Sequence, residues 1–232
     1  MSAGPAIAAF FDVDRTLLAV NSGELWVRHM WREGQLGPGM AARSILWILQ
    51  YRLGLLDFEA VTERAARGYA GRSVAELADE VGAWFRSEIA ASMTPAGRRC
   101  IDEHRAAGHR IALLTSGTRF VAEPVARMLE VASEDILCTE LEVDDGRLTG
   151  RHLPPACGGA GKVTRAEAYA EAAALDLDAS FFYTDSYSDL PMLMRVGNPR
   201  VINPDSRLRR FARRRGWPVE TWAPGEPTPA DG

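Results

Sequence analysis

Hydrophobic residues form three short runs along the chain, at residues 6–11, 110–114 and 180–183. Each run is followed by polar residues and then by apolar positions at the spacing of one helix face. Short apolar runs without alternation are typical of strands that are buried on both faces of a parallel sheet. The pattern therefore predicts an α/β fold with a Rossmann-like parallel sheet.

The interval between the first two runs is too long for an ordinary connection in such a fold. It lacks strand-like alternation, and residues 59–69 and 74–89 have helical periodicity. Because connections in α/β proteins usually have only a few residues, we predict a helical cap domain inserted over residues 21–92. The α/β core would then comprise residues 1–20 and 93–222.

Three smaller elements follow from local signals. A helix is predicted over residues 96–107, because Pro95 suits the first turn of a helix. The alternation on both sides of a turn predicts a hairpin over residues 140–150. Residues 223–232 are rich in proline and glycine, and we predict a disordered tail there.

Composition excludes some classes of partner. The formal net charge of -4 favours neither a nucleic-acid binder nor a membrane-surface protein, so the arginine run within residues 207–215 is interpreted as the solvated face of a last helix. The apolar segment 45–56 is interrupted by Gln50 and Arg52 and is too short for a span of about 30 Å of hydrocarbon. We expect it to pack on neighbouring helices, with contact to a membrane surface or a partner as the open alternative.

The cysteines indicate the compartment. Cys100, Cys138 and Cys157 are odd in number and widely spaced, which favours neither a disulfide framework nor a metal knuckle. The first residues lack a charged segment followed by a long apolar run, the pattern of a secretory signal. These observations predict a cytoplasmic protein.

Acidic residues follow the first and third runs directly. Asp12 and Asp14 stand at the end of the first run, and Asp185 and Asp189 follow the third. One carboxylate of a close pair can attack phosphorus and bind a divalent cation, while the other transfers protons. Carboxylate oxygens favour Mg²⁺. Because His29, His104, His109 and His152 lack the spacing of zinc ligands, we interpret them as structural or surface residues.

The second run and a glycine-rich loop supply further candidates. Thr115, Ser116 and Gly117 follow the second run, and Lys162 stands in Gly158-Gly159-Ala160-Gly161-Lys162-Val163. This loop is not a P-loop, because Ala156 and Val163 occupy positions that need glycine and serine or threonine. A lysine here would be the fixed cation of a phosphorylated site. Ligands of parallel sheets bind beyond the carboxyl ends of the strands, so we expect these clusters to converge.

Taken together and in order, these residues resemble the haloacid dehalogenase (HAD) superfamily, in its phosphoserine-phosphatase-like branch HAD-IB. The resemblance spans residues 6–222 and includes the signature Asp-Ser-Tyr-Ser-Asp-Leu-Pro-Met-Leu at residues 185–193. It implies a Mg²⁺-dependent phosphatase in which Asp12 becomes phosphorylated and Asp14 is the general acid and base.

The resemblance also implies roles for the remaining candidates. Thr16 would brace the loop, and Lys162 would neutralise the aspartyl phosphate. Mg²⁺ would be held by Asp185, Asp12 and the main-chain carbonyl of Asp14, with Asp189 in support. The substrate-binding group is expected to comprise Thr16, Thr115, Ser116, Gly117, Asn21 and Glu24.

One departure from that branch bears on the substrate. Asn21 stands where phosphoserine phosphatases carry a glutamate, and Glu24 compensates only if its helix turns it inward. We therefore predict a small polar phosphorylated metabolite such as histidinol phosphate, with phosphoserine as the second candidate substrate. The sequence is also compatible with a phosphotransferase that uses an alcohol acceptor and with a non-catalytic binding protein that has the HAD fold. Oligomeric state is not predicted.

Overall fold

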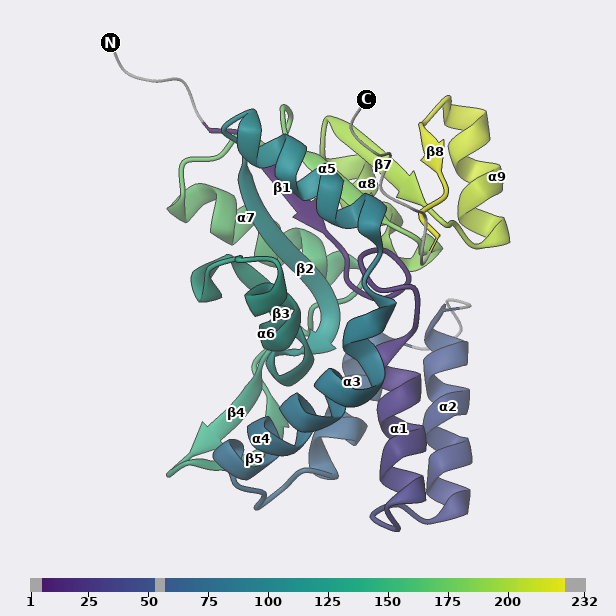
Figure 1. Cartoon of the computed structure of the whole chain (residues 1–232), viewed down its shortest axis with the longest axis vertical. Helices are drawn as coiled ribbons and strands as arrows, with labels where there is room; N and C mark the ends of the chain where they lie inside the picture. Colours follow the sequence, from purple (N-terminus) through teal and green to yellow (C-terminus); the bar gives the residue numbers. More distant parts are fainter. Residues whose placement is uncertain (1–5, 53–56, 224–232) are drawn as a thin grey trace.

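The computed structural model describes residues 6–52 and 57–223, and its centre is a six-stranded sheet (Figure 1). The strand order is β3-β2-β1-β6-β7-β8, and each neighbouring pair is parallel. The predicted parallel α/β sheet is therefore confirmed, and its three predicted strands are neighbours. The bounds are β1 Ala8–Phe11, β2 Arg110–Thr118, β3 Ile136–Thr139, β6 Phe181–Thr184, β7 Asn198–Ile202 and β8 Val219–Glu220.

The side chains of β1 point alternately to the two faces of the sheet and are apolar on both, which explains why helices cover both faces. Ala9 and Phe11 belong to a buried cluster with residues of α5 and α6, whereas Ala8 and Phe10 belong to a second cluster with residues of α7, α8 and α9. Successive side chains of a strand point to opposite faces, so a continuous apolar run needs a cover on each. The covering helices are α5 Pro95–Ala106, α6 Arg119–Met128, α7 Ala160–Ala172, α8 Leu190–Arg195 and α9 Ser206–Arg215.

The interval between β1 and β2 is helical. It contains α1 Ser22–Arg32, α2 Pro38–Arg52, α3 Phe58–Arg67 and α4 Val74–Trp84. Three of these helices begin with a side chain that caps a free backbone amide, from Asn21, Asp57 and Ser73. The helix predicted over residues 74–89 is divided, because α4 passes into a π-helix at Phe85–Ile89 and a 3₁₀ turn at Ala90–Ser92.

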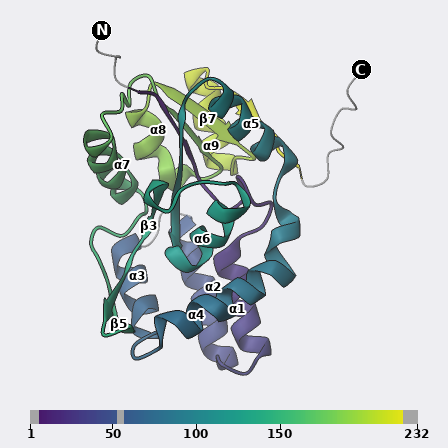
Figure 2. The same cartoon turned by 60° about the vertical axis from the view of Figure 1, so that its left-hand side comes forward.

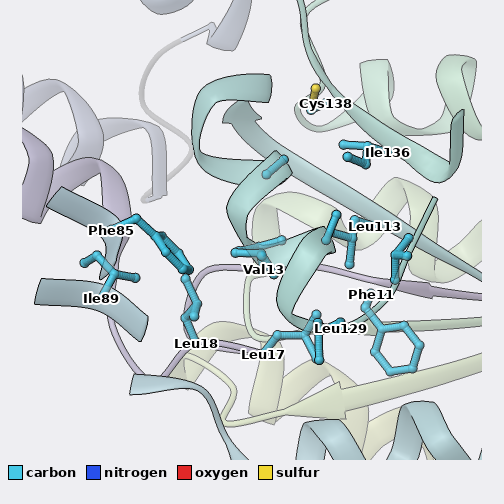
Figure 3. Close-up of a cluster of buried hydrophobic side chains, with 14 of the residues drawn as sticks. Phe11, Val13, Leu17, Leu18, Phe85, Ile89, Leu113, Leu129, Ile136 and Cys138 are labelled. Carbon is cyan, nitrogen blue, oxygen red and sulfur yellow. The ribbon is translucent and has the colours of Figure 1, made fainter. Parts of the chain in front are cut away.

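The helical insert shares a core with the sheet. Phe85 and Ile89 are at most 1% exposed and belong to the same buried cluster as Val13, Leu17 and Leu18 of the loop after β1 (Figure 3). The burial of such side chains stabilises the contact by roughly 1.5–3 kcal/mol each. The insert is therefore packed against the core rather than attached by its connections alone.

A hairpin lies beside the insert, apart from the main sheet. It consists of β4 Leu141–Asp144 and β5 Arg147–His152, and it contacts the α3–α4 turn (Figures 1 and 2). The amide of Gly71 donates to the Leu148 carbonyl at 2.8 Å, and the Leu148 amide donates to the Arg72 carbonyl at 2.9 Å. The hairpin thus extends the insert, although sequence alone groups it with the core. The proposed domain boundaries remain a prediction.

Further expectations concern the surface. The arginines of α9 are exposed, whereas its Leu208 and Ala212 are buried. No helix in residues 6–52 and 57–223 is long and apolar enough to cross a membrane. In the apolar segment 45–56, Leu46 and Leu49 are exposed, and the last four residues lie outside the described part. The tail predicted at residues 223–232 also lies outside it, except for Ala223.

Candidate active site

Asp12 is fixed at the point where β1 ends. Its amide donates to the carbonyl of Tyr183 in β6 at 2.9 Å, and the residue is 6% exposed. Lys162 Nζ donates to Asp12 Oδ1 at 2.8 Å and to Asp189 Oδ2 at 2.7 Å. Lys162 is fully buried and is the only lysine of the sequence. The sole ammonium side chain therefore joins the two acidic clusters predicted from the sequence.

The glycine-rich segment before α7 brings Lys162 into this position. A Cβ on Gly161 would lie 1.9 Å from the carbonyl oxygen of Ala156, so the turn admits only glycine there. Lys162 then falls in the first turn of α7, and its ammonium lies 5.4 Å from the centre of the Phe182 ring. The apolar stem is buried while its charged end reaches the carboxylates.

The acidic cluster after β6 has two members with different surroundings. Asp189 Oδ2 accepts a hydrogen bond from Thr184 Oγ1 at 2.7 Å in addition to the one from Lys162, so Asp189 orients the lysine. Asp185 follows β6 directly, is 4% exposed and lines the main cavity. Its carbonyl oxygen accepts from the Asp205 amide at 3.0 Å.

Asp14 is held by the insert. The amide of Ser22, the first residue of α1, donates to Asp14 Oδ1 at 2.9 Å. Burial raises the pKa of Asp14 above its ordinary value, against the hydrogen bond from Ser22. A carboxyl group with a raised pKa can carry a proton nearer to neutral pH. The start of the cap thus orients a candidate proton donor of the core.

Burial also dominates the electrostatics of Asp12. It raises the pKa of Asp12 to about 7, although the ammonium of Lys162 lowers it. The negative charge of Asp189 acts in the same direction as burial. The cluster therefore contains more acidic groups than its single ammonium can neutralise.

The end of β2 provides hydroxyl and amide groups. Thr115 is 4% exposed, and its Oγ1 accepts a hydrogen bond from the amide of Gly117 at 3.2 Å. The hydroxyl hydrogen remains a donor for a ligand oxygen. The carbonyl of Ser116 accepts from Thr139 Oγ1 at 3.0 Å, which fixes the end of β2 against β3.

One cavity of about 730 Å³ connects these groups to the insert. We define its phosphate end as the polar residues at the carboxyl edge of the sheet. The residues at this end that line the cavity include Asp12, Asp14, Thr115, Ser116, Gly117, Asp185, Ser186, Ser188 and Asp189. We define its cap end as the side chains from α1, α2 and α3 and from the segments that follow α1 and α3. The larger apolar ones at this end are Trp26, Met30, Leu36, Met40, Trp47, Phe58, Val61 and Tyr69.

Two of the predicted substrate-binding residues are not brought to this cavity. Thr16 is fully buried and does not line it. Glu24 lines a separate cavity of about 510 Å³, and its Oε1 accepts from Arg28 at 2.5 Å on the same helix. Asn21 lines both cavities, but its Oδ1 caps α1 by accepting from the Glu24 amide at 2.8 Å. Helix geometry therefore turns Glu24 away from the carboxylates.

Sequence reasoning missed Ser22 and the apolar side chains of the cap end. The signal for Ser22 was available, because an asparagine before a helical pattern marks a helix start whose amides are free. The apolar positions gave no separate signal, since cavity-lining and core-packing positions share one helical periodicity. None of the four histidines lines the cavity in the described part of the chain.

The donor set fits a hard divalent cation. Asp12 and Asp185 are buried carboxylates at one end of the cavity, where acidic groups outnumber the ammonium. Within residues 6–52 and 57–223, no three His, Cys, Asp or Glu side chains form a ready metal cluster. A cation here would thus need main-chain oxygens and water as further ligands. Mg²⁺ accepts such a set, because it usually keeps several waters.

The fold and the site together define a class of enzyme. Acidic residues at the carboxyl edge of a parallel sheet, a buried lysine and a helical insert above them are features of a phosphoryl-transfer hydrolase. The sequence model of haloacid dehalogenase-like hydrolases matches residues 9–194, and the chain belongs to this family.

Known proteins support the same class. A histidinol-phosphatase of Neisseria meningitidis serogroup C (strain 8013) is 29% identical over 91% of this chain and 96% of that protein. A phosphoserine phosphatase of Mycobacterium tuberculosis (strain H37Rv) is 36% identical over 91% of this chain and 70% of that protein. A Bordetella pertussis Tohama I structure of unknown function has a TM-score of 0.83 and 34% identity, covering 93% of this chain and 98% of the second chain. The chain is a phosphatase of the family.

Proposed function

We propose that the protein hydrolyses small phosphomonoesters through a phosphoaspartyl intermediate on Asp12, with Mg²⁺ as the cofactor. One observation carries the proposal. Lys162 Nζ lies 2.8 Å from Asp12 Oδ1 at the end of a cavity that Asp14, Thr115 and Asp185 also line. Groups from three strand ends and one helix start thus meet at one place, as attack on a phosphate requires.

The first half-reaction uses the carboxylate of Asp12 as the nucleophile. A bond forms between an Asp12 oxygen and phosphorus, and the bond from phosphorus to the leaving alcohol oxygen breaks. Asp14 donates its proton to that oxygen, which its raised pKa favours. The Thr115 hydroxyl would donate to a phosphate oxygen, and the Lys162 ammonium would stabilise the added negative charge.

The second half-reaction regenerates the carboxylate. Asp14, now ionised, takes a proton from water, and the water oxygen attacks phosphorus. The bond between phosphorus and the Asp12 oxygen breaks, which releases inorganic phosphate. Asp12, Asp185 and the main-chain carbonyl of Asp14 would hold Mg²⁺, which when bound neutralises negative charge on the phosphate.

The test is phosphate release by the purified protein with Mg²⁺, before and after chelation. We include p-nitrophenyl phosphate, phosphoserine and histidinol phosphate. Asp12→Asn is expected to lower turnover by about 10⁴-fold or more while the fold persists. The matched control is Asp102→Asn on α5, whose side chain is 62% exposed. Activity that survives Asp12→Asn or exhaustive chelation would refute the nucleophile or the cofactor, respectively.

A phosphotransferase shares the first half-reaction and differs in the acceptor. We therefore repeat the assay with an added alcohol and measure alcohol release and phosphate release separately. Hydrolysis predicts equal amounts of both products. An excess of leaving alcohol over phosphate, with a new phosphate ester formed, would identify transfer to the acceptor instead.

A further inference from the structure

The cap end of the cavity is mostly apolar and aromatic, in contrast to the phosphate end, although Gln35, Ser44 and Thr62 also line it. Trp26, Trp47, Phe58, Val61 and Tyr69 line it, and most of these side chains are only partly buried. An apolar wall open to solvent is the usual mark of a binding surface. The volume of about 730 Å³ exceeds what a phosphate group and a two- or three-carbon alcohol need.

Among the described residues, the charged side chains that line the cap end are all positive. Among the described residues that line the cavity, the cap supplies no acidic side chain. Its charged members are Arg64, which lies 5.8 Å from the ring centre of Trp47, and Arg72, which lies 5.9 Å from that of Tyr69. Arg72 pairs with Glu80, which does not line the cavity.

These surroundings discriminate between possible leaving alcohols. An ammonium group bound at the cap end would lose water and gain no carboxylate partner, which is unfavourable. Methylene groups or an aromatic ring would gain the transfer of apolar surface from water. Both phosphoserine and histidinol phosphate carry an ammonium, whereas the wall offers aromatic faces and guanidinium groups.

Building on the proposed phosphatase activity, we propose that the substrate is a phosphomonoester with an extended apolar or aromatic alcohol that bears no cationic group. The phosphate end performs the reaction on any ester, and the cap end selects this class of alcohol. This proposal differs from the small polar metabolite expected from the sequence, which stays a prediction.

The first test is a series of n-alkyl phosphates from ethyl to hexyl. Burial of each added methylene is expected to raise kcat/KM about fourfold until the wall is filled. The charged counterpart, 6-aminohexyl phosphate, is expected to have a kcat/KM at least about tenfold below hexyl phosphate. A flat series, or phosphoserine or histidinol phosphate above hexyl phosphate, would overturn the assignment.

The second test separates binding from reaction. Hexylphosphonate and 6-aminohexylphosphonate have a carbon–phosphorus bond that is not hydrolysed, and their Kd values are measured by calorimetry with Mg²⁺ present. The expected Kd ratio is at least about tenfold in favour of the uncharged compound. Equal Kd values would overturn the cap-end assignment, whatever the turnover. The expected ratio without turnover of any ester would refute the proposed activity alone.

The third test uses matched tryptophans of the cap. Trp47→Ala is expected to lower the hexyl-to-ethyl ratio of kcat/KM about tenfold. Trp31→Ala, at a tryptophan that is 53% exposed and does not line the cavity, is expected to leave it unchanged. Val61→Glu adds a carboxylate to the wall and is expected to favour 6-aminohexyl phosphate. Thermal unfolding verifies that each variant is folded, and unchanged ratios in Trp47→Ala and Val61→Glu would overturn the proposal.

Discussion

The two ends of the cavity are built in different ways. At the phosphate end, Asp12, Asp189 and Lys162 are almost completely buried and fixed by hydrogen bonds of 2.7 to 2.8 Å. At the cap end, Trp47 of α2 and Tyr69 in the turn after α3 are partly exposed aromatic side chains. Polar groups held in fixed positions suit a reaction that is common to many substrates. The apolar side chains of the cap end can change without disturbing the groups that react. Changes at the phosphate end should therefore affect all esters, and changes at the cap end should distinguish between them.

Among changes that leave the nucleophile Asp12 in place, the largest effect should come from Asp14. We expect Asp14→Asn to slow phosphorylation of Asp12 by an alkyl phosphate about 10²- to 10⁴-fold, because an alkoxide needs a proton as it leaves. p-Nitrophenyl phosphate, whose leaving group is stable as an anion, should lose much less. Rapid-quench measurement of the phosphorylation step gives both rates. Equal losses for the two esters would contradict the role of Asp14 as a proton donor.

A smaller loss, uniform across substrates, should follow removal of the buried ammonium. Lys162→Met is expected to lower kcat about 10²- to 10³-fold for ethyl and hexyl phosphate alike, because a charge fixed at the site is lost. Arg127→Met, at a side chain that is 76% exposed, is the control for loss of a cation. A loss that depends on the alcohol would show that the two ends are not independent.

Substitution at a contact between cap and core should increase local opening of the backbone near that contact. Glu59 on α3 accepts from the Ala156 amide at 2.9 Å and lies 2.6 Å from His152 Nε2. Glu59→Gln weakens these charge-assisted bonds, so the Ala156 amide should exchange its hydrogen about 10- to 100-fold faster. Glu63→Gln on the same helix, where the glutamate pairs only with exposed Arg67 among the interactions described, is the control. Unchanged exchange in Glu59→Gln would exclude this contact as a tether.

The smallest expected effect is on folding stability, and it comes from a residue of the core away from both ends of the cavity. Burial lowers the pKa of His104 to about 4, with added repulsion from His109 and Arg200. The unfolded chain then binds a proton below about pH 6.5 while the folded protein does not, so stability is lost as pH falls from about 6.5 to 4. We expect this loss to be about 2 kcal/mol greater in the parent than in His104→Gln. Chemical denaturation at several pH values tests this, with His29→Gln as control, and parallel pH profiles would disprove it.

The strands that carry the site were predictable because each combines a simple pattern with a chemical signal. Residues 6–11, 110–114 and 180–183 are apolar runs followed by polar clusters, and β1, β2 and β6 occupy them within about two residues except that β2 continues to Thr118. The outer strands β7, which begins with Asn198-Pro199-Arg200, and β8, which has two residues, form no such apolar run. Their pairing depends on contacts distant in sequence, which local periodicity does not contain.

The positions of individual side chains were harder to predict. Lys162 gave a weak signal in a glycine-rich loop, and its contact with Asp12 joins residues 150 positions apart. The direction of Glu24 depended on where α1 begins, and one residue of shift rotates a side chain by about 100°. The predicted cap interval contains the helices, but no pattern in sequence shows which of their apolar faces remains uncovered.

The ends of the insert lie side by side. The Ala19 amide donates to the Ser92 carbonyl at 2.8 Å, and the Thr94 amide donates to the Leu17 carbonyl at 2.8 Å. The chain therefore leaves the core and returns to it across a gap that a short turn could close. Leu17 and Leu18 would lose the cover of Phe85 and Ile89 if nothing replaced the insert.

We expect this arrangement to allow the insert to be exchanged as a unit. A cap grafted from a relative between residues 20 and 93 would meet the same two anchor points, provided that it brings an apolar patch for Leu17 and Leu18 and a helix amide for Asp14. Selection could thus alter the preferred alcohol in one segment of coding sequence without any change to the strands that hold the nucleophile.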